Sequence, residues 1–308
     1  MFRRSVLGLD IHHDELRAVN LKRVDGKAVP CAARVVKLDP EIICPHFSDI
    51  NIPQIEPFRA AVTEVLVPIA GKTRRLAVAL PDRAGKVFLL ELEQPIKNRR
   101  EGAELIRWHL REELPKQTTN QICLDYQVVD VAASGRTRVL VAVIKETVLT
   151  EFEEALRLAG YDVDLISFHS PALFNCHQIQ ATTDADYILI GLHGQQLCLM
   201  IVVRNRLVFL RSRTVNMNAE EAVREISRTL AGYRSDRDFL AQTPVILLLD
   251  WTALPRLGLQ ACIADYFGKE AIVANPMGHI VQNKPADMNI RSIYPAWGVA
   301  ERLIVRKR

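Results

Sequence analysis

The stretch VLGLDIHHDELRAVNL, residues 6–21, decides the fold. Its two ends are apolar and its middle is polar, which predicts a strand, a tight turn and a second strand. Asp10 stands near the end of the first strand, and His12 and His13 follow it. Backbone N–H groups of such a turn can surround a phosphate, and an aspartate beside it can hold Mg²⁺ or its waters. The Cβ atoms of the histidines hinder a close approach that glycine would allow, so this turn keeps the acid without the open backbone.

A second stretch, YILIGLHGQQLCLMIVV at residues 187–203, echoes the first. It also predicts a strand, a turn and a strand, and apolar sequence follows each copy: AVPCAARVV after the first and RLVFL after the second. Both halves of the chain are therefore expected to open with a β-meander, as in a duplicated α/β unit. The second turn offers no acid, and its Gly191 and Gly194 are explained by the needs of a tight hairpin.

The length of 308 residues suits two lobes, each with its own core. The polar sequence ATTDAD at residues 181–186 separates the two apolar halves, so the lobe boundary is placed there. We expect a first lobe over residues 1–182, with an inserted subdomain around 76–135, and a second lobe over residues 183–308.

Helical patterns lie between the strands of the first lobe. Asn98 and Glu101 form a capping box, and apolar residues then recur on one helical face until Pro115 ends the pattern. A second helix is expected from about Thr150 to Ala159, with Gly160 as its C-cap. Beyond the two hairpins, strands are expected at Leu76–Leu80, Val87–Leu92 and Val139–Val143.

Composition narrows the class of protein. With 49% hydrophobic and 25% charged residues the chain resembles an ordinary globular protein, and a net charge of +4 spread along it does not demand a nucleic-acid partner. No apolar run has the length needed to cross a bilayer. The cysteines form no C-x-x-C pair, which indicates buried thiols in a reducing compartment and hence a cytoplasmic protein. They are Cys31, Cys44, Cys123, Cys176, Cys198 and Cys262.

Catalytic and metal-binding motifs are weak in this sequence. It contains neither a G-x-S-x-G elbow nor a P-loop lysine motif, and His169 beside Ser170 lacks a third group to orient a nucleophile and base. His12 and His13 are adjacent, so in an extended strand they would point to opposite faces and make poor co-ligands for one metal. The sequence therefore predicts no catalytic residue and no metal site.

Several longer stretches resemble the PilM family, the actin-like cytoplasmic proteins of type IV pilus assembly. The opening hairpin is similar to the family's GLDIG hairpin, and the most specific part is the long middle block. That block contains RWHLREELPKQTTNQICLDYQVVD at residues 107–130 and VLVAVIKETVLTEFEEALRLAGYDVDLISFHSPAL at residues 139–173. Further similar stretches are LVFLRSRTV, EEAVREISRTLAGY and YPAWGVAERL, at residues 207–215, 220–233 and 294–303. The resemblance implies an α/β protein of the actin-like (ASKHA) fold, with two lobes of mixed sheets flanked by helices.

The departures from the family pattern occur at the positions that bind the nucleotide in the family. Where the family has Asp-Ile-Gly at the second phosphate turn, this sequence has Gly191, Leu192 and His193, and where it has a Gly-Gly turn near the adenosine, this sequence has Asp250 and Trp251. The degenerate nucleotide-site positions are Asp10, His12, His13, Gly191, His193, Gly194, Asp250 and Trp251. These departures imply a hairpin that survives without its nucleotide and a protein that is not an enzyme.

By resemblance, the function is that of a non-catalytic scaffold in type IV pilus assembly. Its partners would be the cytoplasmic N-terminal segment of a PilN-like inner-membrane protein, held in a groove of the first lobe, and the pilus assembly platform and motor. The sequence does not identify the groove residues. Peripheral attachment to the inner membrane through these partners and a homo-oligomer are also expected, and no cofactor is expected.

The alternatives are an active ATPase of the same fold using ATP with Mg²⁺, and a scaffold of a type II secretion or MSHA-type pilus system. A sugar kinase would need a catalytic aspartate that cannot be located.

Overall fold

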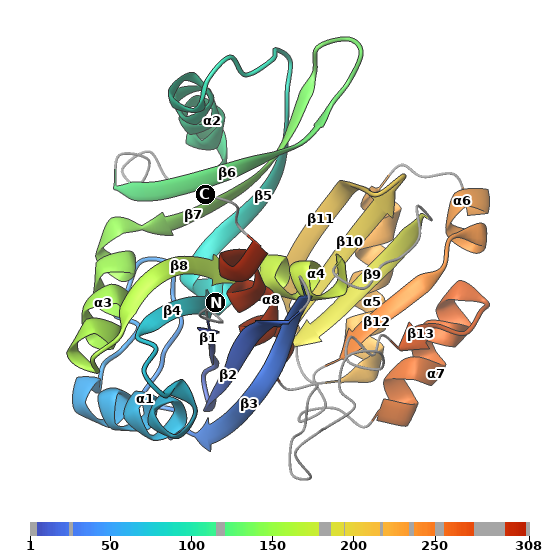
Figure 1. Ribbon diagram of the computed structural model, residues 1–308. Coiled ribbons are helices and arrows are strands. Elements are labelled where there is room, and N and C mark those ends of the chain that lie inside the picture. Colours follow the sequence, from blue (N-terminus) through green and yellow to red (C-terminus); the bar gives the residue numbers. More distant parts are fainter. Residues whose placement is uncertain are drawn as a thin grey trace.

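The computed structural model describes residues 5–24, 27–114, 121–178, 186–193, 195–215, 218–233, 237–249, 256–273 and 293–305. They form two five-stranded mixed sheets and one three-stranded sheet, with helices between and around them (Figure 1). The predicted α/β architecture of mixed sheets flanked by helices is confirmed.

The first sheet has the strand order β3-β2-β1-β4-β8. Its first three strands form the predicted antiparallel meander, and β4 and β8 add to β1 in parallel. Helices α1 and α3 cover one face, where Phe58 and Phe152 are fully buried. The bounds are β1 Ser5–Ile11, β2 Glu15–Val24, β3 Lys27–Lys37, α1 Ile55–Ala70, β4 Arg75–Leu80, α3 Glu146–Leu158 and β8 Asp162–Phe168.

The second sheet repeats this arrangement as β11-β10-β9-β12-β13, again with an antiparallel meander followed by two parallel strands. The internal repeat predicted from the two hairpin sequences is therefore confirmed at the level of topology. Helices α5 and α7 bury apolar residues against one face of this sheet. The bounds are β9 Tyr187–His193, β10 Gln196–Val203, β11 Arg206–Thr214, α5 Ala219–Gly232, α6 Arg237–Gln242, β12 Val245–Leu249, α7 Arg256–Phe267 and β13 Ile272–Val273.

The third sheet, in the order β5-β7-β6, packs against α2 and projects from the first lobe (Figure 1). The predicted capping box is confirmed, because the Asn98 side chain accepts a hydrogen bond from the backbone N–H of Glu101 at 3.0 Å. The bounds are β5 Gly85–Leu92, α2 Arg99–Glu113, β6 Ile122–Val131 and β7 Thr137–Lys145, preceded by the 3₁₀ turn η1, Asp82–Ala84.

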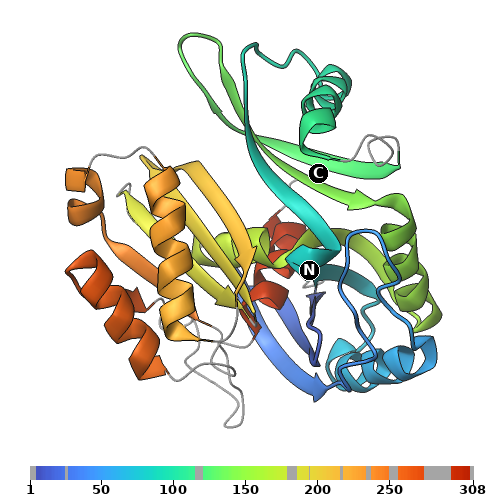
Figure 2. The same cartoon turned by 180° about the vertical axis from the view of Figure 1, so that it is seen from behind.

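Two helices, α4 (His169–Gln178) and α8 (Tyr294–Val305), lie between the five-stranded sheets, as both views show (Figures 1 and 2). They share one apolar core with residues of both sheets, and Trp297 at its centre is fully buried. Helix α8 approaches β1 closely because Gly8 has no side chain: a Cβ at that position would stand 2.0 Å from the carbonyl oxygen of Ala296. The helices that pack between the two sheets thus come from the middle and from the C-terminal part of the described chain.

Of the remaining predictions from the sequence, some are confirmed and one is wrong in part. The strands and the two helices predicted for the first lobe are present, α3 beginning at Glu146, four residues earlier than expected. All six cysteines are free thiols, but the expectation that they are buried is wrong for Cys31 and Cys44, which are exposed on β3 and in the loop after it. No described helix combines the length and apolar character that crossing a membrane requires.

The division into lobes at residue 182 lies outside the described residues and stays a prediction. The inserted subdomain expected around 76–135 also stays a prediction. In the structure β4 at Arg75–Leu80 pairs in the first sheet, and the small sheet runs from Gly85 to Lys145. Helix α8 belongs by sequence to the expected second lobe, yet it packs on the first sheet.

Candidate functional site

The two hairpins place a histidine at the same position of each lobe. In the first, the backbone N–H of His12 bonds to the carbonyl of Glu15 at 3.0 Å, closing a two-residue turn. In the second, His193 pairs with Gln196 across a turn of the same length. His12 and His193 are therefore equivalent in the repeat, and their ring centroids lie 5.2 Å apart. By the same register Gly191 corresponds to Asp10, so the second hairpin lacks the acid of the first.

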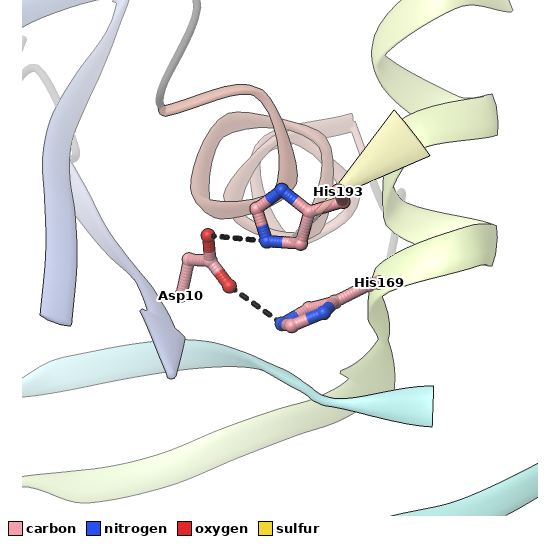
Figure 3. A group of neighbouring side chains, drawn as sticks. All are labelled: Asp10, His169 and His193. Atoms are coloured by element: carbon pink, nitrogen blue, oxygen red, sulfur yellow. Dashed lines mark ion pairs between the residues drawn. The ribbon is translucent and has the colours of Figure 1, made fainter. Parts of the chain in front are cut away.

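Asp10 is fully buried at the centre of this arrangement. One carboxylate oxygen lies 2.7 Å from Nε2 of His169, at the start of α4, and the other lies 3.2 Å from Nε2 of His193 (Figure 3). His169 Nε2 also lies 3.2 Å from the carbonyl oxygen of Ile11. The acid of the first lobe is thus contacted by a helix between the sheets and by the hairpin of the second lobe.

A buried arginine completes the cluster. Arg17 of β2 is fully buried, and its guanidinium lies 3.6 Å from Asp10 and 3.2 Å from Nδ1 of His193. Its Nε donates to the carboxylate of Glu15 at 2.5 Å, and Lys37 pairs with the same carboxylate at 2.8 Å. A buried charge is tolerated when it is paired and hydrogen-bonded, and here charges of alternating sign run from the surface to Asp10.

Burial and the neighbouring charges set the protonation states. Burial by itself raises the pKa of Asp10, but the charges and hydrogen bonds of His169 and His193 outweigh it and hold that pKa well below its usual range. Burial lowers the pKa of His169, and Asp10 only partly opposes this. Burial also lowers the pKa of His12 to about 4, against the opposing hydrogen bond to Asp14. At neutral pH the Asp10 carboxylate is therefore ionised, and burial favours the neutral forms of His12 and His169.

A second polar cluster joins the lobes beside the first. Asp82, in η1, accepts hydrogen bonds from the backbone N–H of Ser170 at 3.0 Å and from the hydroxyl of Ser212 at 2.7 Å. The hydroxyl of Ser170 also donates to Asp82, and Gln196 donates to Ser212 at 2.6 Å. Because Ser212 and Gln196 belong to the second sheet, these bonds connect it to the first lobe.

A cavity of about 440 Å³ opens above the two hairpins. The hairpins supply His12, His13 and His193, and α4 supplies His169. The opposite wall is the loop after β3, which Asn51 organises by donating from its side chain to the carbonyls of His46 and Asp49. A cavity rich in imidazoles thus occupies the place where the two hairpins meet.

Among the predicted site residues, Asp10, His12, His13 and His193 meet at this cavity or its floor, and Gly191 lies on β9 two residues before His193. Gly194, Asp250 and Trp251 lie outside the described residues. Sequence reasoning missed the part played by Arg17 and Asp82, and it treated His169 only as an unsupported neighbour of Ser170. A charged Arg17 inside an apolar strand was an available signal, because such a residue needs a buried partner.

The structure holds two groups of possible metal ligands among the described residues: Asp10, His169 and His193, and the turn residues His12, His13 and Asp14. The expectation that His12 and His13 point to opposite faces is wrong. They lie in the turn and not in extended strand, and their ring centroids are 4.3 Å apart.

Comparisons with known proteins place the fold. No protein-family model and no curated protein matches the sequence. Among solved structures, the chain is similar to a PilM-PilN type IV pilus biogenesis complex, with a TM-score of 0.77 and 17% identity over 99% of this chain and 100% of that one. It is also similar to a Bacteroides thetaiotaomicron protein with an actin-like ATPase fold, with a TM-score of 0.57 and 11% identity over 89% of this chain and 92% of that one. The cytoplasmic domain of EpsL, an inner-membrane component of the Vibrio cholerae type II secretion system, matches with a TM-score of 0.53 and 11% identity over 99% of this chain and 97% of that one. The chain therefore has the actin-like fold in the form found in PilM and in cytoplasmic EpsL.

Proposed function

We propose that this protein is a non-catalytic scaffold of a type IV pilus assembly complex at the cytoplasmic face of the inner membrane. The observation that carries the proposal is that side chains of the protein itself connect the two lobes at the floor of the cavity between the hairpins. His193 contacts Asp10 at 3.2 Å and Ser212 donates to Asp82 at 2.7 Å, each pair joining the first lobe to the second sheet. A nucleotide is not needed to hold these lobes together.

The same residues argue against Mg·ATP. Both hairpins end in a buried imidazole where a phosphate turn needs open backbone. A phosphate can enter the space of the His12 or His193 ring only if that side chain moves away. Asp10 could bind Mg²⁺ or its waters only after losing His169 and His193, which would leave buried polar groups without their present partners. The residues present do not fit a magnesium nucleotide, so no catalytic step follows from the family resemblance.

For the partner, the PilM-PilN complex that this fold matches supports a PilN-like protein, and the sequence resemblance to the PilM family favours its cytoplasmic N-terminal segment. An extended segment binds well along an open strand edge, where main-chain hydrogen bonds give affinity and pockets give specificity. Among the described residues β5 is an edge strand of the small sheet, and it forms one wall of a groove of about 530 Å³. The other wall is β11, an edge strand of the second sheet, with Arg211 and Arg213 lining the groove.

Calorimetry on the purified full chain tests both parts of the proposal. We expect no saturable binding of Mg·ATP up to millimolar nucleotide, and binding of a synthetic PilN-like N-terminal peptide that is the same with and without nucleotide. Saturable ATP binding that Asp10→Ala weakens would instead support the active ATPase. A chain that binds neither ligand would contradict the scaffold assignment.

The groove is tested with charge reversals. Arg213 is exposed and lines the groove, so Arg213→Glu is expected to weaken peptide binding about tenfold by changing the charge along β11. Lys72→Glu, at an exposed position before β4 that does not line this groove, is the matched control. Equal loss in both variants would show a general charge effect and contradict the groove.

The likeness to cytoplasmic EpsL favours one alternative, a scaffold of a type II secretion system. Titration with N-terminal peptides of the inner-membrane proteins from both kinds of system separates the two. The pilus assignment requires the PilN-like peptide to bind more tightly. Analytical ultracentrifugation of the same samples measures whether the scaffold works as a homo-oligomer, and co-purification measures contact with the assembly platform and motor.

A further inference from the structure

We propose that Asp10, His169 and His193 form a binding site for one divalent transition-metal ion of the zinc class, held between the two lobes. The three side chains come from β1, from the start of α4 and from the end of β9, and all are buried (Figure 3). The inference does not depend on the pilus assignment, because its ligands and its test involve this chain alone.

The spacing of the donor atoms fits one ion. Each residue offers one donor atom: Asp10 a carboxylate oxygen, and each histidine an imidazole nitrogen. These three atoms lie within 4.8 Å of one another, and the two Asp10–histidine distances are 2.7 and 3.2 Å. Ligands at about 2.1 Å from a metal are separated by about 3.0 Å at right angles and about 3.4 Å at tetrahedral angles. The two Asp10–histidine distances, which start from different oxygens of Asp10, fall near these edges, and an ion requires the carboxylate and the rings to rearrange around it.

The types of ligand select the class of ion. Two imidazole nitrogens and one carboxylate suit Zn²⁺, Co²⁺, Ni²⁺ or Fe²⁺, whereas Mg²⁺ and Ca²⁺ prefer oxygen ligands. Three protein ligands leave positions open for water, and the cavity of about 440 Å³, which both histidines line, provides room for it. This arrangement also provides the path by which an ion can enter.

The charge around the site favours a dication. The cluster and its neighbours carry four negative charges on carboxylates and two positive charges on paired side chains. The cavity wall adds one negative and one positive charge, which leaves the difference unchanged. The carboxylates are Asp10, Asp14, Glu15 and Asp82, the cations are Arg17 and Lys37, and the wall adds Asp49 and Arg83. Around the buried ligands, which include the Asp10 carboxylate, an excess of two negative charges is stabilised by one divalent ion.

Arg17 determines what must change when the ion enters. A guanidinium only donates, so Nδ1 of His193 accepts from Arg17 at 3.2 Å and the imidazole proton resides on Nε2, facing Asp10. An ion at Nε2 replaces this proton, which moves to Nδ1, and Arg17 must then turn away toward Glu15, to which it already donates. Arg17 is thus a gate on the site and weakens the affinity for metal.

The expected consequence is a metal-dependent connection between the lobes. Asp10 belongs to the first sheet and His193 to the second, so an ion bound to both resists their separation. Binding to the folded state alone raises the midpoint of thermal unfolding.

Titration of the full chain with Co²⁺, followed by its visible absorption, tests the site, and Zn²⁺ calorimetry gives the stoichiometry. We expect one ion per chain and a raised unfolding temperature. His193→Gln and His169→Gln should each weaken binding by about 100-fold or more, because loss of a ligand exceeds the 10–100-fold cost of losing an outer hydrogen-bond partner. His13→Gln is the matched control, since His13 lines the same cavity outside the proposed ligand set.

Arg17→Gln supplies a variant that gains affinity, which misfolding cannot imitate. A glutamine oxygen can accept from protonated Nδ1 of His193, so this variant should bind Co²⁺ about tenfold more tightly. Circular dichroism confirms that each variant is folded. Absence of Co²⁺ and Zn²⁺ binding, or binding lost in His13→Gln and kept in His193→Gln, overturns the proposal.

Discussion

Gly298 in α8 lies against Ala172 in α4, so closely that a Cβ on the glycine would stand 1.9 Å from the alanine carbonyl oxygen. This contact sets the distance between the two helices that separate the sheets. Since backbone atoms cannot yield as flexible side chains do, a side chain at this position must push the helices apart.

Gly298→Ala is therefore expected to destabilise the protein by about 3 kcal/mol or more, the upper range for overpacking a core. The measurement is urea unfolding followed by circular dichroism. Gly232→Ala is the matched control, because Gly232 ends α5 and a Cβ there meets no atom within 4 Å. An unfolding midpoint in Gly298→Ala equal to that of the control would contradict the close approach.

Ser212→Ala is expected to loosen the lobes. The serine hydroxyl donates to the Asp82 carboxylate at 2.7 Å, and a hydrogen bond to a charged group contributes about 1.5–3 kcal/mol. Hydrogen exchange of the β10–β11 hairpin should accelerate in the variant, and the unfolding midpoint should fall. Ser134→Ala, in the exposed loop between β6 and β7, should change neither. Unchanged exchange in Ser212→Ala would show that the bond does not hold the second sheet in place.

Glu301→Gln is expected to stabilise the protein above neutral pH. Burial raises the pKa of the Glu301 carboxyl to about 7, against the opposing hydrogen bond from Trp297 at 3.0 Å. A carboxyl whose pKa is raised on folding favours the folded state at low pH, and this contribution is lost as the pH rises through about 7. At pH 8 the difference is on the order of 3 kcal/mol, and it vanishes near pH 4.

Urea unfolding of wild type and Glu301→Gln between pH 4 and 8 checks this. Glu112→Gln, at an exposed position of α2, serves as the control for the loss of one negative charge. If the wild type and Glu301→Gln keep a constant difference across this range, the carboxyl does not titrate there.

Asn98→Ala is expected to cost about 1 kcal/mol, because the side chain caps α2 by accepting from the backbone N–H of Glu101 at 3.0 Å. Asn98→Asp keeps an acceptor at the same place and should restore most of the loss, and a negative charge there also suits the helix N-terminus. The unfolding midpoint measures both. An equal loss in the two variants would mean that the cap contributes nothing.

The two meanders could be predicted because they depend on local patterns that the chain repeats. The apolar run, the two-residue turn and the second run occur twice, and each copy folded into a meander that opens one sheet. The capping box at Asn98 is equally local, since its two members are three residues apart.

The site was harder to foresee because its contacts are remote in sequence. His169 reaches Asp10 only because α4 begins beside the hairpin, and His193 reaches it only because the sheets pack together. The strand registers of the two hairpins show that His12 and His193 occupy equivalent positions. What the pattern could not reveal is that His169 and His193 converge on the carboxylate of Asp10.

The packing of α8 also imposes an order on biosynthesis. The first sheet buries one of its faces, including Val19 and Ala77, only when residues beyond 293 are in place. During translation the N-terminal half therefore emerges with an apolar face uncovered and cannot finish folding until α8 has left the ribosome. A nascent chain that ends before α8 is expected to bind chaperones or aggregate, so the two halves of this duplicated fold are made one after the other but mature together.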